Sequence, residues 1–208
     1  MPWVRVPSLA PIAVTDRPIA AVILAGGAAR RLGGGDKPLL DLGGQPILAR
    51  IMAALSGIGP VVISANGDPE RFTAFGLPVL SDGPFAGQGP LAGILAALDW
   101  ANERGAGTLL SVPGDTPFLP AGLAASLAPA PAYAHCERAH YLVALWPVSA
   151  RYHLRRLLSA PAPRDVAAFA QSIGMRPVVF PDMARDCFLN VNTPEDLAAA
   201  RTRAEAQR

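Results

Sequence analysis

A single lysine, Lys37, follows a segment rich in glycine and arginine. The chain carries 18 basic residues and 17 of them are arginine, so the one compact ammonium group indicates a specific need for it. The preceding segment, Leu24–Asp36, contains five glycines and two arginines, one of them Arg31. Glycines let backbone amides approach an anion, and Arg and Lys neutralise phosphate charge. We therefore predict a phosphate-binding loop, with a surface loop of incidental charge as the alternative.

This loop matches neither of the common phosphate-binding motifs. Lys37 is followed by Pro38, so the Gly-x4-Gly-Lys-Ser/Thr pattern of P-loop proteins is absent. The glycines also lack the Gly-x-Gly-x-x-Gly spacing of dinucleotide-binding folds. The sequence therefore argues against both of these classes.

Two aspartates could hold a metal ion beside such a loop. Asp82 and Asp115 each follow a short apolar run. Mg²⁺ is commonly held by one or two carboxylates together with substrate phosphates and water. A turn or cap aspartate is the alternative for either residue alone. Two of them beside a Gly/Arg/Lys loop favour metal-assisted phosphate chemistry.

Other reactive side chains carry weaker signals. His135, Cys136 and His140 form a loose cluster whose spacing matches no zinc motif. Ser64 and Ser111 lack the Gly-x-Ser-x-Gly surroundings of a hydrolase nucleophile. The sequence therefore favours neither a zinc protein nor a serine hydrolase.

Apolar runs and helical periodicities alternate along the chain and must position these residues. Strands are expected at 20–25, 61–65, 78–82, 108–112, 141–146 and 177–180. Helices are expected at 46–55, 69–75, 90–102, 149–158 and 164–173. A further helix is expected to begin with Thr193 as N-cap and Pro194 in its first turn. This alternation predicts an α/β domain with a mostly parallel sheet.

The residues at or shortly after the ends of the first four expected strands are glycine or polar. They are Gly26–Gly27, Asn66, Asp82 and Asp115. Because open parallel sheets bind ligands at the carboxyl ends of their strands, we expect these four positions to meet at one edge of the sheet.

The composition is typical of a folded chain with a large core. Of the 208 residues, 51% are apolar and 16% charged, and at this length one domain is expected. A net charge of +2 gives no electrostatic case for nucleic-acid binding, and two cysteines suit a reducing compartment. No apolar run reaches the ~20 residues that a membrane span requires. We expect a soluble, cytoplasmic protein, with 1–18 as a loose extension and 19–208 as one domain.

In their order and spacing, several short segments resemble the molybdenum cofactor guanylyltransferases, a family of nucleotidyltransferases. The resemblance covers nearly the whole chain after the extension. It rests on Leu24–Gly27, Arg31–Gly33, Asp36–Lys37, Ser64–Asn66, Asp82, Gly89–Gly93, Pro113–Pro117 and Asn190–Leu197. The family usually has Cys at the position of Gly114, and often His-Pro at the position of His140-Tyr141.

The resemblance implies a fold, a reaction and partners. The fold would be a three-layer α/β/α sandwich with a mostly parallel, Rossmann-like sheet of the nucleotide-diphospho-sugar transferase type. The reaction would transfer GMP from GTP to molybdenum-molybdopterin, with Mg²⁺ as cofactor and pyrophosphate as the second product. Besides these two substrates, the implied partners are other cofactor-biosynthesis proteins and recipient molybdoenzymes, with no nucleic acid and no membrane.

The resemblance also implies residue roles. The nucleotide would be bound by Leu24, Ala25, Gly26, Lys37, Asn66, Asp82 and Asp115. Within that set Lys37 would contact phosphates, Asn66 and Asp82 would recognise base or ribose, and Asp115 would hold Mg²⁺. The catalytic residues would be Arg31, Lys37 and Asp115. Asn190 and Asn192 would lie on the acceptor side.

Rival functions remain open at this stage. One is a cytidylyltransferase acting on the same cofactor, or a sugar-phosphate nucleotidyltransferase. The Leu-Ala-Gly-Gly form of Leu24–Gly27 favours guanine, because cytidylyl relatives tend to have Leu-Ala-Ala-Gly. A more distant rival is a non-catalytic nucleotide-binding or cofactor-handling module, and the presence of both Lys37 and Asp115 argues against it.

Overall fold

A computed structural model describes residues 17–26, 35–161, 163–180 and 188–206. The expected extension at 1–18 therefore lies almost wholly outside the described residues, and so does Arg31 with most of the glycine-rich segment. Among the described residues, no helix is long and apolar enough to cross a membrane.

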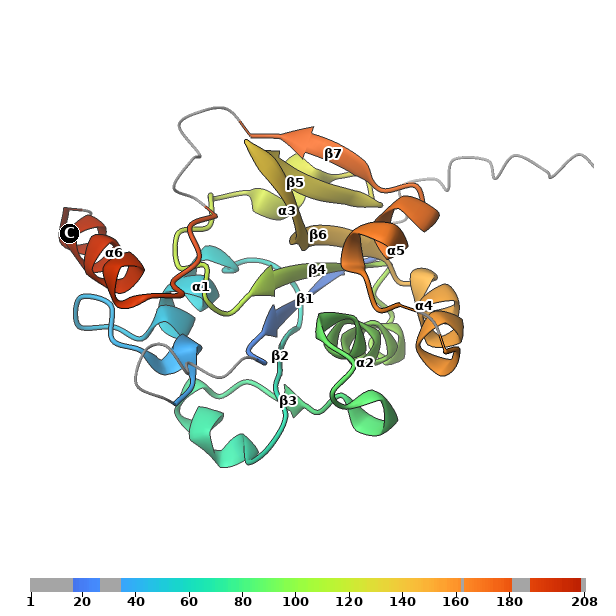
Figure 1. The fold of residues 1–208 in the computed structure, drawn as a ribbon, viewed down its shortest axis with the longest axis horizontal. Coiled ribbons are helices and arrows are strands. Elements are labelled where there is room, and N and C mark those ends of the chain that lie inside the picture. Colours follow the sequence, from blue (N-terminus) through green and yellow to red (C-terminus); the bar gives the residue numbers. More distant parts are fainter. Residues whose placement is uncertain (1–16, 27–34, 162, 181–187, 207–208) are drawn as a thin grey trace, which may run out of the picture.

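A sheet of seven strands runs through the middle of the described chain, in the order β3-β2-β1-β4-β6-β5-β7 (Figure 1). The strands are β1 (Ile19–Leu24), β2 (Val61–Ser64), β3 (Val79–Leu80), β4 (Thr108–Pro113), β5 (Ala132–Cys136), β6 (Arg138–Pro147) and β7 (Arg176–Val179). Every pair in the sheet is parallel except those that β6 makes with β4 and β5. The expectation of a mostly parallel sheet is therefore confirmed.

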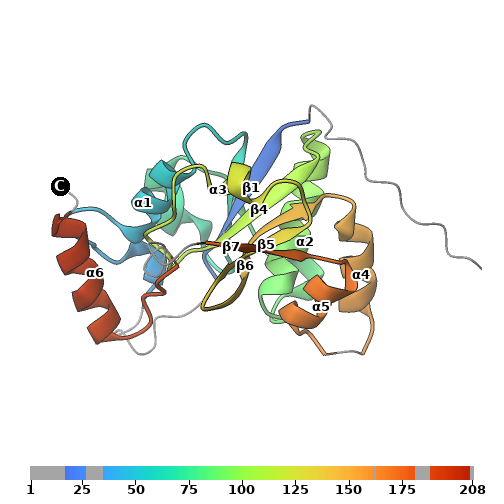
Figure 2. The same ribbon diagram turned by 90° about the horizontal axis from the view of Figure 1, so that it is seen from above.

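Helices cover both faces of this sheet, which gives the expected three layers (Figure 2). The helices are α1 (Ile47–Ala54), α2 (Pro90–Glu103), α3 (Leu123–Leu127), α4 (Ala150–Ser159), α5 (Val166–Ser172) and α6 (Pro194–Ala206). In Figure 2, α1, α3 and α6 lie on one side of the sheet and α2, α4 and α5 on the other. Short 3₁₀ helices, η2 (Lys37–Leu39), η3 (Pro69–Phe75) and η4 (Gly83–Phe85), follow the ends of β1, β2 and β3.

Each face of the sheet has its own apolar core, because successive strand residues point to opposite faces. On the α1 side, Ile23 of β1 packs in a cluster that includes Ile51 and Phe188. On the α2 side, Val22 of β1 packs in a cluster that includes Leu95 and Trp146. Both β1 residues are fully buried, which explains why the first strand reads as a continuous apolar run.

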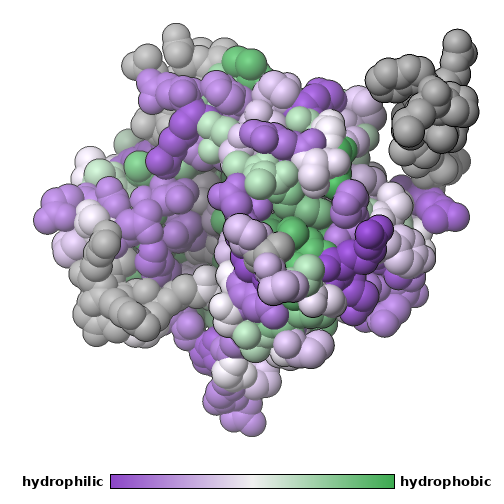
Figure 3. All heavy atoms as spheres, turned by 45° about the vertical axis from the view of Figure 1, so that its right-hand side comes forward, coloured by the Kyte–Doolittle hydropathy of each residue, from purple (hydrophilic) through white to green (hydrophobic). Residues whose placement is uncertain are grey.

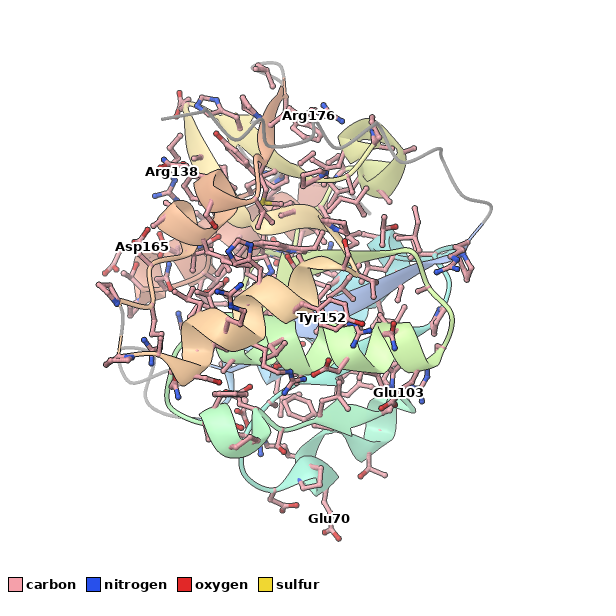
Figure 4. All side chains as sticks on the ribbon, turned by 90° about the vertical axis from the view of Figure 1, so that its right-hand side faces the viewer. Glu70, Glu103, Arg138, Tyr152, Asp165 and Arg176 are labelled. Carbon is pink, nitrogen blue, oxygen red and sulfur yellow. The ribbon has the colours of Figure 1, made fainter. Side chains whose placement is uncertain are left out.

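The outer surface over α4 and α5 is largely polar. Figure 3 shows hydrophilic side chains over most of this side of the molecule, with hydrophobic atoms reaching the surface mainly near its centre. Figure 4 shows α4 lying against α2, with Tyr152 on α4 and Glu103 at the end of α2. Asp99 of α2 joins the two helices through ion pairs to Arg151 and Arg155. On this side, α4 and α5 cover one face of the sheet, and the polar ends of the parallel strands are at an edge of the sheet instead.

The structure adds four elements that the sequence pattern missed, the strand β5, the helix α3 and the 3₁₀ helices η2 and η4, and it redefines one. The strand β5 and the short helix α3 were not expected, since alternation in Ala132–Cys136 is masked by small residues and α3 has only five residues. The segment Pro69–Phe75 is a 3₁₀ helix, begun by Asp68, whose side chain accepts a hydrogen bond from the Glu70 N–H at 2.9 Å. The remaining expected strands and helices lie within a few residues of their predicted bounds.

Candidate active site

A cavity of about 680 Å³ opens at the carboxyl ends of the parallel strands. It is lined by residues from the ends of β1, β2 and β4, from η2, and from the start of α2. This volume lies in the usual range for small-molecule sites, and the location follows the general rule for open parallel sheets. The four expected strand-end positions contribute Gly26, Asn66, Asp82 and Asp115 to this one cavity.

Lys37 and Asp115 line one end of the cavity, which we call the Lys37 end, and we count with it Asn192, which contacts Lys37 without lining the cavity. The Lys37 ammonium lies 3.4 Å from Asp115 Oδ2 and donates a hydrogen bond to Asn192 Oδ1. The Lys37 and Asp115 side chains are only 17% and 20% exposed, so their charges are partly shielded from water. A cation and an anion held side by side can contact phosphate and a metal ion at the same time.

Close backbone packing sets the position of this end. Gly114 N donates to the carbonyl oxygen of Leu24 at 2.9 Å, which continues the pairing of β1 with β4. A Cβ on Gly114 would lie 2.8 Å from Pro38 Cγ and 3.0 Å from Leu24 O. Gly114 therefore lets Pro38 approach the end of β4. Because Lys37 precedes Pro38 and Asp115 follows Gly114, this approach brings Lys37 and Asp115 together. This packing is a physical reason for glycine at a position where the resembled family usually has Cys.

The other end of the cavity, the Asp82 end, consists of Ser64, Asn66, Asp82 and Gly93. Asn66 Nδ2 donates to Asp82 Oδ2 at 2.6 Å, and the Asp82 N–H donates to Asn66 Oδ1 at 3.0 Å. These reciprocal hydrogen bonds hold the end of β2 against the end of β3. They also leave Asp82 Oδ1 without a hydrogen bond to any residue that the structure describes. Such an oxygen can accept N–H or O–H groups of a ligand.

Arg71 of η3 is a cavity residue that the sequence reasoning missed. Its Nε lies 2.7 Å from Asp36 Oδ2, and its Nη2 donates to the Asn66 carbonyl oxygen at 2.6 Å. The guanidinium also lies over the ring of Phe72, 4.8 Å from its centroid. Arg71 thus joins the residue before Lys37 to the residue at the other end of the cavity. The sequence did not predict this role for Arg71, because its contact with Asp36 forms only when η3 folds against the segment before Lys37.

The two asparagines near the C-terminus have different neighbours. Asn192 belongs to the Lys37 end, whereas Asn190 lines the cavity and accepts a hydrogen bond from Thr116 Oγ1 at 3.0 Å. The Val191 N–H between them donates to the Asp115 carbonyl oxygen at 2.9 Å. The segment is therefore held to the end of β4 at two points, and Asn192 adds a contact with Lys37 of η2.

The start of α6 fixes Asn192 from the other side. Asp196 Oδ2 accepts the backbone N–H groups of Asn192 and Thr193, each at 2.9 Å, and Thr193 Oγ1 accepts the Asp196 N–H at 3.2 Å. This is the reciprocal capping arrangement that begins a helix, as the sequence predicted. The hydrogen bond from the Asn192 N–H is the largest cause that lowers the pKa of Asp196 below its usual value.

The expected site residues divide into those that meet and those that do not. Leu24, Ala25 and Gly26 line the cavity between its two ends, as does Leu142 of β6. His140 packs against Phe188, and burial lowers the pKa of its imidazole, so the side chain is neutral near pH 7. Arg31 lies outside the described residues.

A metal ion would find one protein carboxylate at the Lys37 end. Within the described ranges, no three His, Cys, Asp or Glu side chains gather into a protein cage. Asp115 Oδ1 makes no hydrogen bond to a described residue, while Oδ2 faces Lys37. One free carboxylate oxygen beside a phosphate-sized cavity fits Mg²⁺, which takes most of its ligands from phosphate and water.

Three comparisons relate this chain to known proteins. The family model described as "MobA-like NTP transferase domain" matches residues 21–202. The molybdenum cofactor guanylyltransferase of Acidiphilium cryptum (strain JF-5) is 56% identical over 88% of this chain and 93% of its own. The molybdenum cofactor guanylyltransferase of Rhodobacter capsulatus is 47% identical over 89% of this chain and 96% of its own.

A solved structure confirms the fold type. Molybdopterin-guanine dinucleotide biosynthesis protein A from Archaeoglobus fulgidus superposes with a TM-score of 0.71 and 22% identity, over 90% of this chain and 99% of the other. At this identity the likeness is evidence of fold alone. It agrees with the nucleotide-diphospho-sugar transferase type that the resemblance implied.

Proposed function

We propose that this protein transfers GMP from GTP to molybdenum-molybdopterin. The chain belongs to the MobA-like NTP transferase family, and it is a nucleotidyltransferase. The products are molybdopterin guanine dinucleotide cofactor and pyrophosphate. The single observation that carries this proposal is the cavity with two unlike ends. Lys37 and Asp115 at one end suit phosphates, and Asn66 and Asp82 at the other suit a base or ribose.

The nucleotide lies across the ends of β1 and β2 in this proposal. Leu24, Ala25 and Gly26 contact it through backbone groups between the two ends of the cavity. Asp82 Oδ1 accepts N–H groups of the guanine edge, because a carboxylate accepts hydrogen bonds and cannot donate them. Asn190, on the far wall beside Asp115, faces the acceptor.

The reaction is a displacement at the α-phosphorus of GTP. A phosphate oxygen of the acceptor forms a bond to that phosphorus, and the bond to the bridging oxygen of the β-phosphate breaks. Pyrophosphate leaves with that oxygen and its electron pair. The acceptor phosphate is already anionic near pH 7, so no general base is chemically required. The protein contributes positioning and charge neutralisation, as in other phosphoryl transfers.

Lys37 neutralises charge that develops on the leaving pyrophosphate, and Asp115 holds Mg²⁺. In the free protein Asp115 and Asn192 hold the ammonium in place, so little reorganisation is needed when phosphates arrive. Bound Mg²⁺ would supply charge neutralisation across the phosphate oxygens. We propose Arg31, in the glycine-rich segment, as a second cation on the phosphates.

Turnover with different nucleotides tests this proposal. Purified protein is given molybdenum-molybdopterin, Mg²⁺ and either GTP or CTP, and pyrophosphate release is measured. We expect strong preference for GTP, since a site with unpaired polar groups rejects a mismatched base. Equal turnover with CTP would support the cytidylyltransferase alternative. Binding of GTP without pyrophosphate release would support a non-catalytic module.

The remaining expectations concern the protein's surroundings. Molybdenum-molybdopterin must be supplied to the site and the dinucleotide cofactor must leave it, so we propose direct contact with other cofactor-biosynthesis proteins and with recipient molybdoenzymes. A cytoplasmic location stays a prediction, as does the arrangement of one domain after an N-terminal extension.

A further inference from the structure

The hydroxyl of Ser64 opens into the cavity and has no hydrogen-bond partner among the described residues. Ser64 is the last residue of β2 and is 4% exposed, and its side chain makes no hydrogen bond with any residue that the structure describes. The Ser64 oxygen is not one of the fully enclosed unpaired side-chain atoms of the described residues, so it is accessible from the cavity. A hydroxyl in the core is normally paired. Ser111 of β4 shows the usual case, since its hydroxyl donates to the Leu142 carbonyl oxygen and accepts from Trp146 Nε1, both at 2.8 Å. The Ser64 hydroxyl is therefore free to bond to a ligand in the cavity, whereas the Ser111 hydroxyl is already paired.

The Ser64 hydroxyl lies in the cavity beside Asp82. Both residues line the cavity, and both face the first turns of α2. A Cβ on Gly93 of α2 would overlap Ser64 Oγ and would lie 3.3 Å from Asp82 Oδ1. The glycine therefore leaves one small space into which a hydroxyl and a carboxylate oxygen both point.

These two oxygens have complementary hydrogen-bonding capacities. The carboxylate only accepts, whereas the hydroxyl can donate. Guanine presents the matching pattern along one edge, with the N1 and N2 hydrogens as donors next to O6 as acceptor. We infer that Ser64 is a specificity-determining residue whose hydroxyl donates a hydrogen bond to guanine O6, beside the N–H groups that Asp82 accepts. This inference rests on the proposed function, because it presumes that the base occupies the Asp82 end.

The two residues then contribute differently to base selection. Adenine has a lone pair at N1, which a carboxylate repels, so Asp82 rejects adenine. A hydroxyl can rotate to accept from an amino group, so Ser64 adds affinity for 6-oxo purines and does not by itself exclude adenine. Inosine keeps O6 and lacks the N2 amino group. Ser64 should therefore contribute equally to the affinities for GTP and ITP, whereas Asp82 should contribute more to the affinity for GTP.

Nucleotide-binding affinities of the full chain test the inference. Dissociation constants for GTP, ITP and 6-thio-GTP are measured for the wild type and for Ser64→Ala and Ser64→Cys. Both variants should weaken GTP and ITP by about tenfold, which is typical for one lost hydrogen bond. With 6-thio-GTP, whose sulfur is a weak acceptor, the loss should be below about threefold. Ser172→Ala is the control, because Ser172 is exposed and bonds only to Phe169 O at 2.7 Å.

Thermal unfolding separates this role from a structural one. Without nucleotide, Ser64→Ala should be about as stable as the wild type, because it removes a hydroxyl that makes no hydrogen bond within the described residues. With GTP, it should gain less in melting temperature than the wild type does.

Each failure identifies what is wrong. Unchanged GTP affinity in Ser64→Ala would overturn the inference, and so would an equal loss with 6-thio-GTP, which would place the hydroxyl elsewhere on the nucleotide. A variant that is less stable without nucleotide and shows no dependence on the base would make Ser64 structural. The proposed function is tested separately by the nucleotide affinities of the wild type. If the wild type bound CTP as tightly as GTP, the proposed function would be contradicted.

Discussion

The two ends of the cavity are assembled in different ways. Asn66 and Asp82 are 16 positions apart, so the Asp82 end forms within one stretch of strands and turns. Lys37 lies 78 positions from Asp115 and 155 from Asn192, so the Lys37 end needs three distant parts of the chain. Base binding should therefore tolerate changes near the C-terminus, whereas turnover should depend on them. Substitutions can separate the two ends experimentally.

Removal of Asp115 should have the largest effect. Asp115→Ala deletes the one carboxylate of the Lys37 end and should lower kcat by at least about a thousandfold, since a metal-ion contribution amounts to several kcal/mol. GTP binding without metal should change much less, because the Asp82 end is intact. Pyrophosphate release against Mg²⁺ concentration measures the first effect and calorimetry the second.

Asp99→Ala is the matched control for Asp115→Ala. It removes an aspartate that is ion-paired on the α2–α4 surface, far from the strand ends, and should leave kcat unchanged. Wild-type turnover by Asp115→Ala with Mg²⁺ would show that the metal lies elsewhere.

Replacement of Lys37 by arginine should have the next largest effect. Lys37→Arg keeps the charge, but the planar guanidinium is wider than the ammonium that fits between Asp115 and Asn192. Displacement of the phosphates by ~1 Å should cost about a hundredfold in rate. A loss mainly in kcat means that Lys37 acts on developing charge, and a loss mainly in KM means ground-state binding. Unchanged steady-state kinetics would exclude Lys37 from the site.

A methyl group on Gly114 should disturb the Lys37 end without touching any charge. In Gly114→Ala the new Cβ would meet Pro38 Cγ at 2.8 Å, and overpacking of this kind costs about 1–3 kcal/mol of stability. Because Pro38 adjoins Lys37, kcat should fall roughly tenfold. Pro38→Ala removes the clashing atom, so the double variant should regain part of both losses. Failure of this rescue, measured by thermal unfolding and kinetics, would show that the contact with Leu24 O dominates.

The local character of the Asp82 end also explains what the sequence could predict. The sequence predicted that four strand-end residues would meet, because a parallel sheet brings the carboxyl ends of its strands to one edge. They are Gly26, Asn66, Asp82 and Asp115, and all four line the cavity. The helix start at Thr193 was also predicted, since capping residues act over three positions. Information within a few residues, combined with one rule of sheet topology, was sufficient for these features.

Contacts between distant segments were not predictable in this way. No periodicity or motif pairs Lys37 with Asn192, or Arg71 with Asp36, because each contact depends on the folded path of loops. The strand β6 was predicted at 141–146, but its antiparallel direction was not, since the apolar pattern of a buried strand is the same in either direction. The roles of the site residues stay predictions until the variants are measured.

Loss of Arg71 should disturb both ends of the cavity, with a smaller effect on turnover. Arg71→Ala frees Asp36, next to Lys37, and removes the hydrogen bond to Asn66 O. Partly exposed ion pairs contribute about 1 kcal/mol, so we expect about a fivefold loss in kcat/KM shared between kcat and KM. Arg71→Lys cannot bridge both partners and should recover little. A loss confined to one parameter would contradict a role that joins the two ends.

The smallest effect should come from Asp196, and it should depend on pH. The Asn192 N–H, then that of Thr193, holds the pKa of Asp196 below its usual value. A carboxylate with a lowered folded-state pKa stabilises the fold above its ordinary pKa of about 4, and this stabilisation disappears as pH falls through the lowered value. Asp196→Asn should therefore cost up to about 1 kcal/mol at pH 7, because Asn keeps an acceptor oxygen but loses the negative charge at the start of the helix.

Comparison across pH isolates this contribution. The stability difference between wild type and Asp196→Asn should shrink as pH falls below about 4, because protonation removes the same charge from the wild type. Glu195→Gln serves as the control, since Glu195 makes none of the hydrogen bonds that Asp196 makes to Asn192 and Thr193. Because Asn192 holds Lys37, Asp196→Asn should lower kcat about twofold and leave GTP affinity unchanged. A loss of GTP affinity would mean that the start of α6 supports the Asp82 end as well, and the two ends would then not be independent.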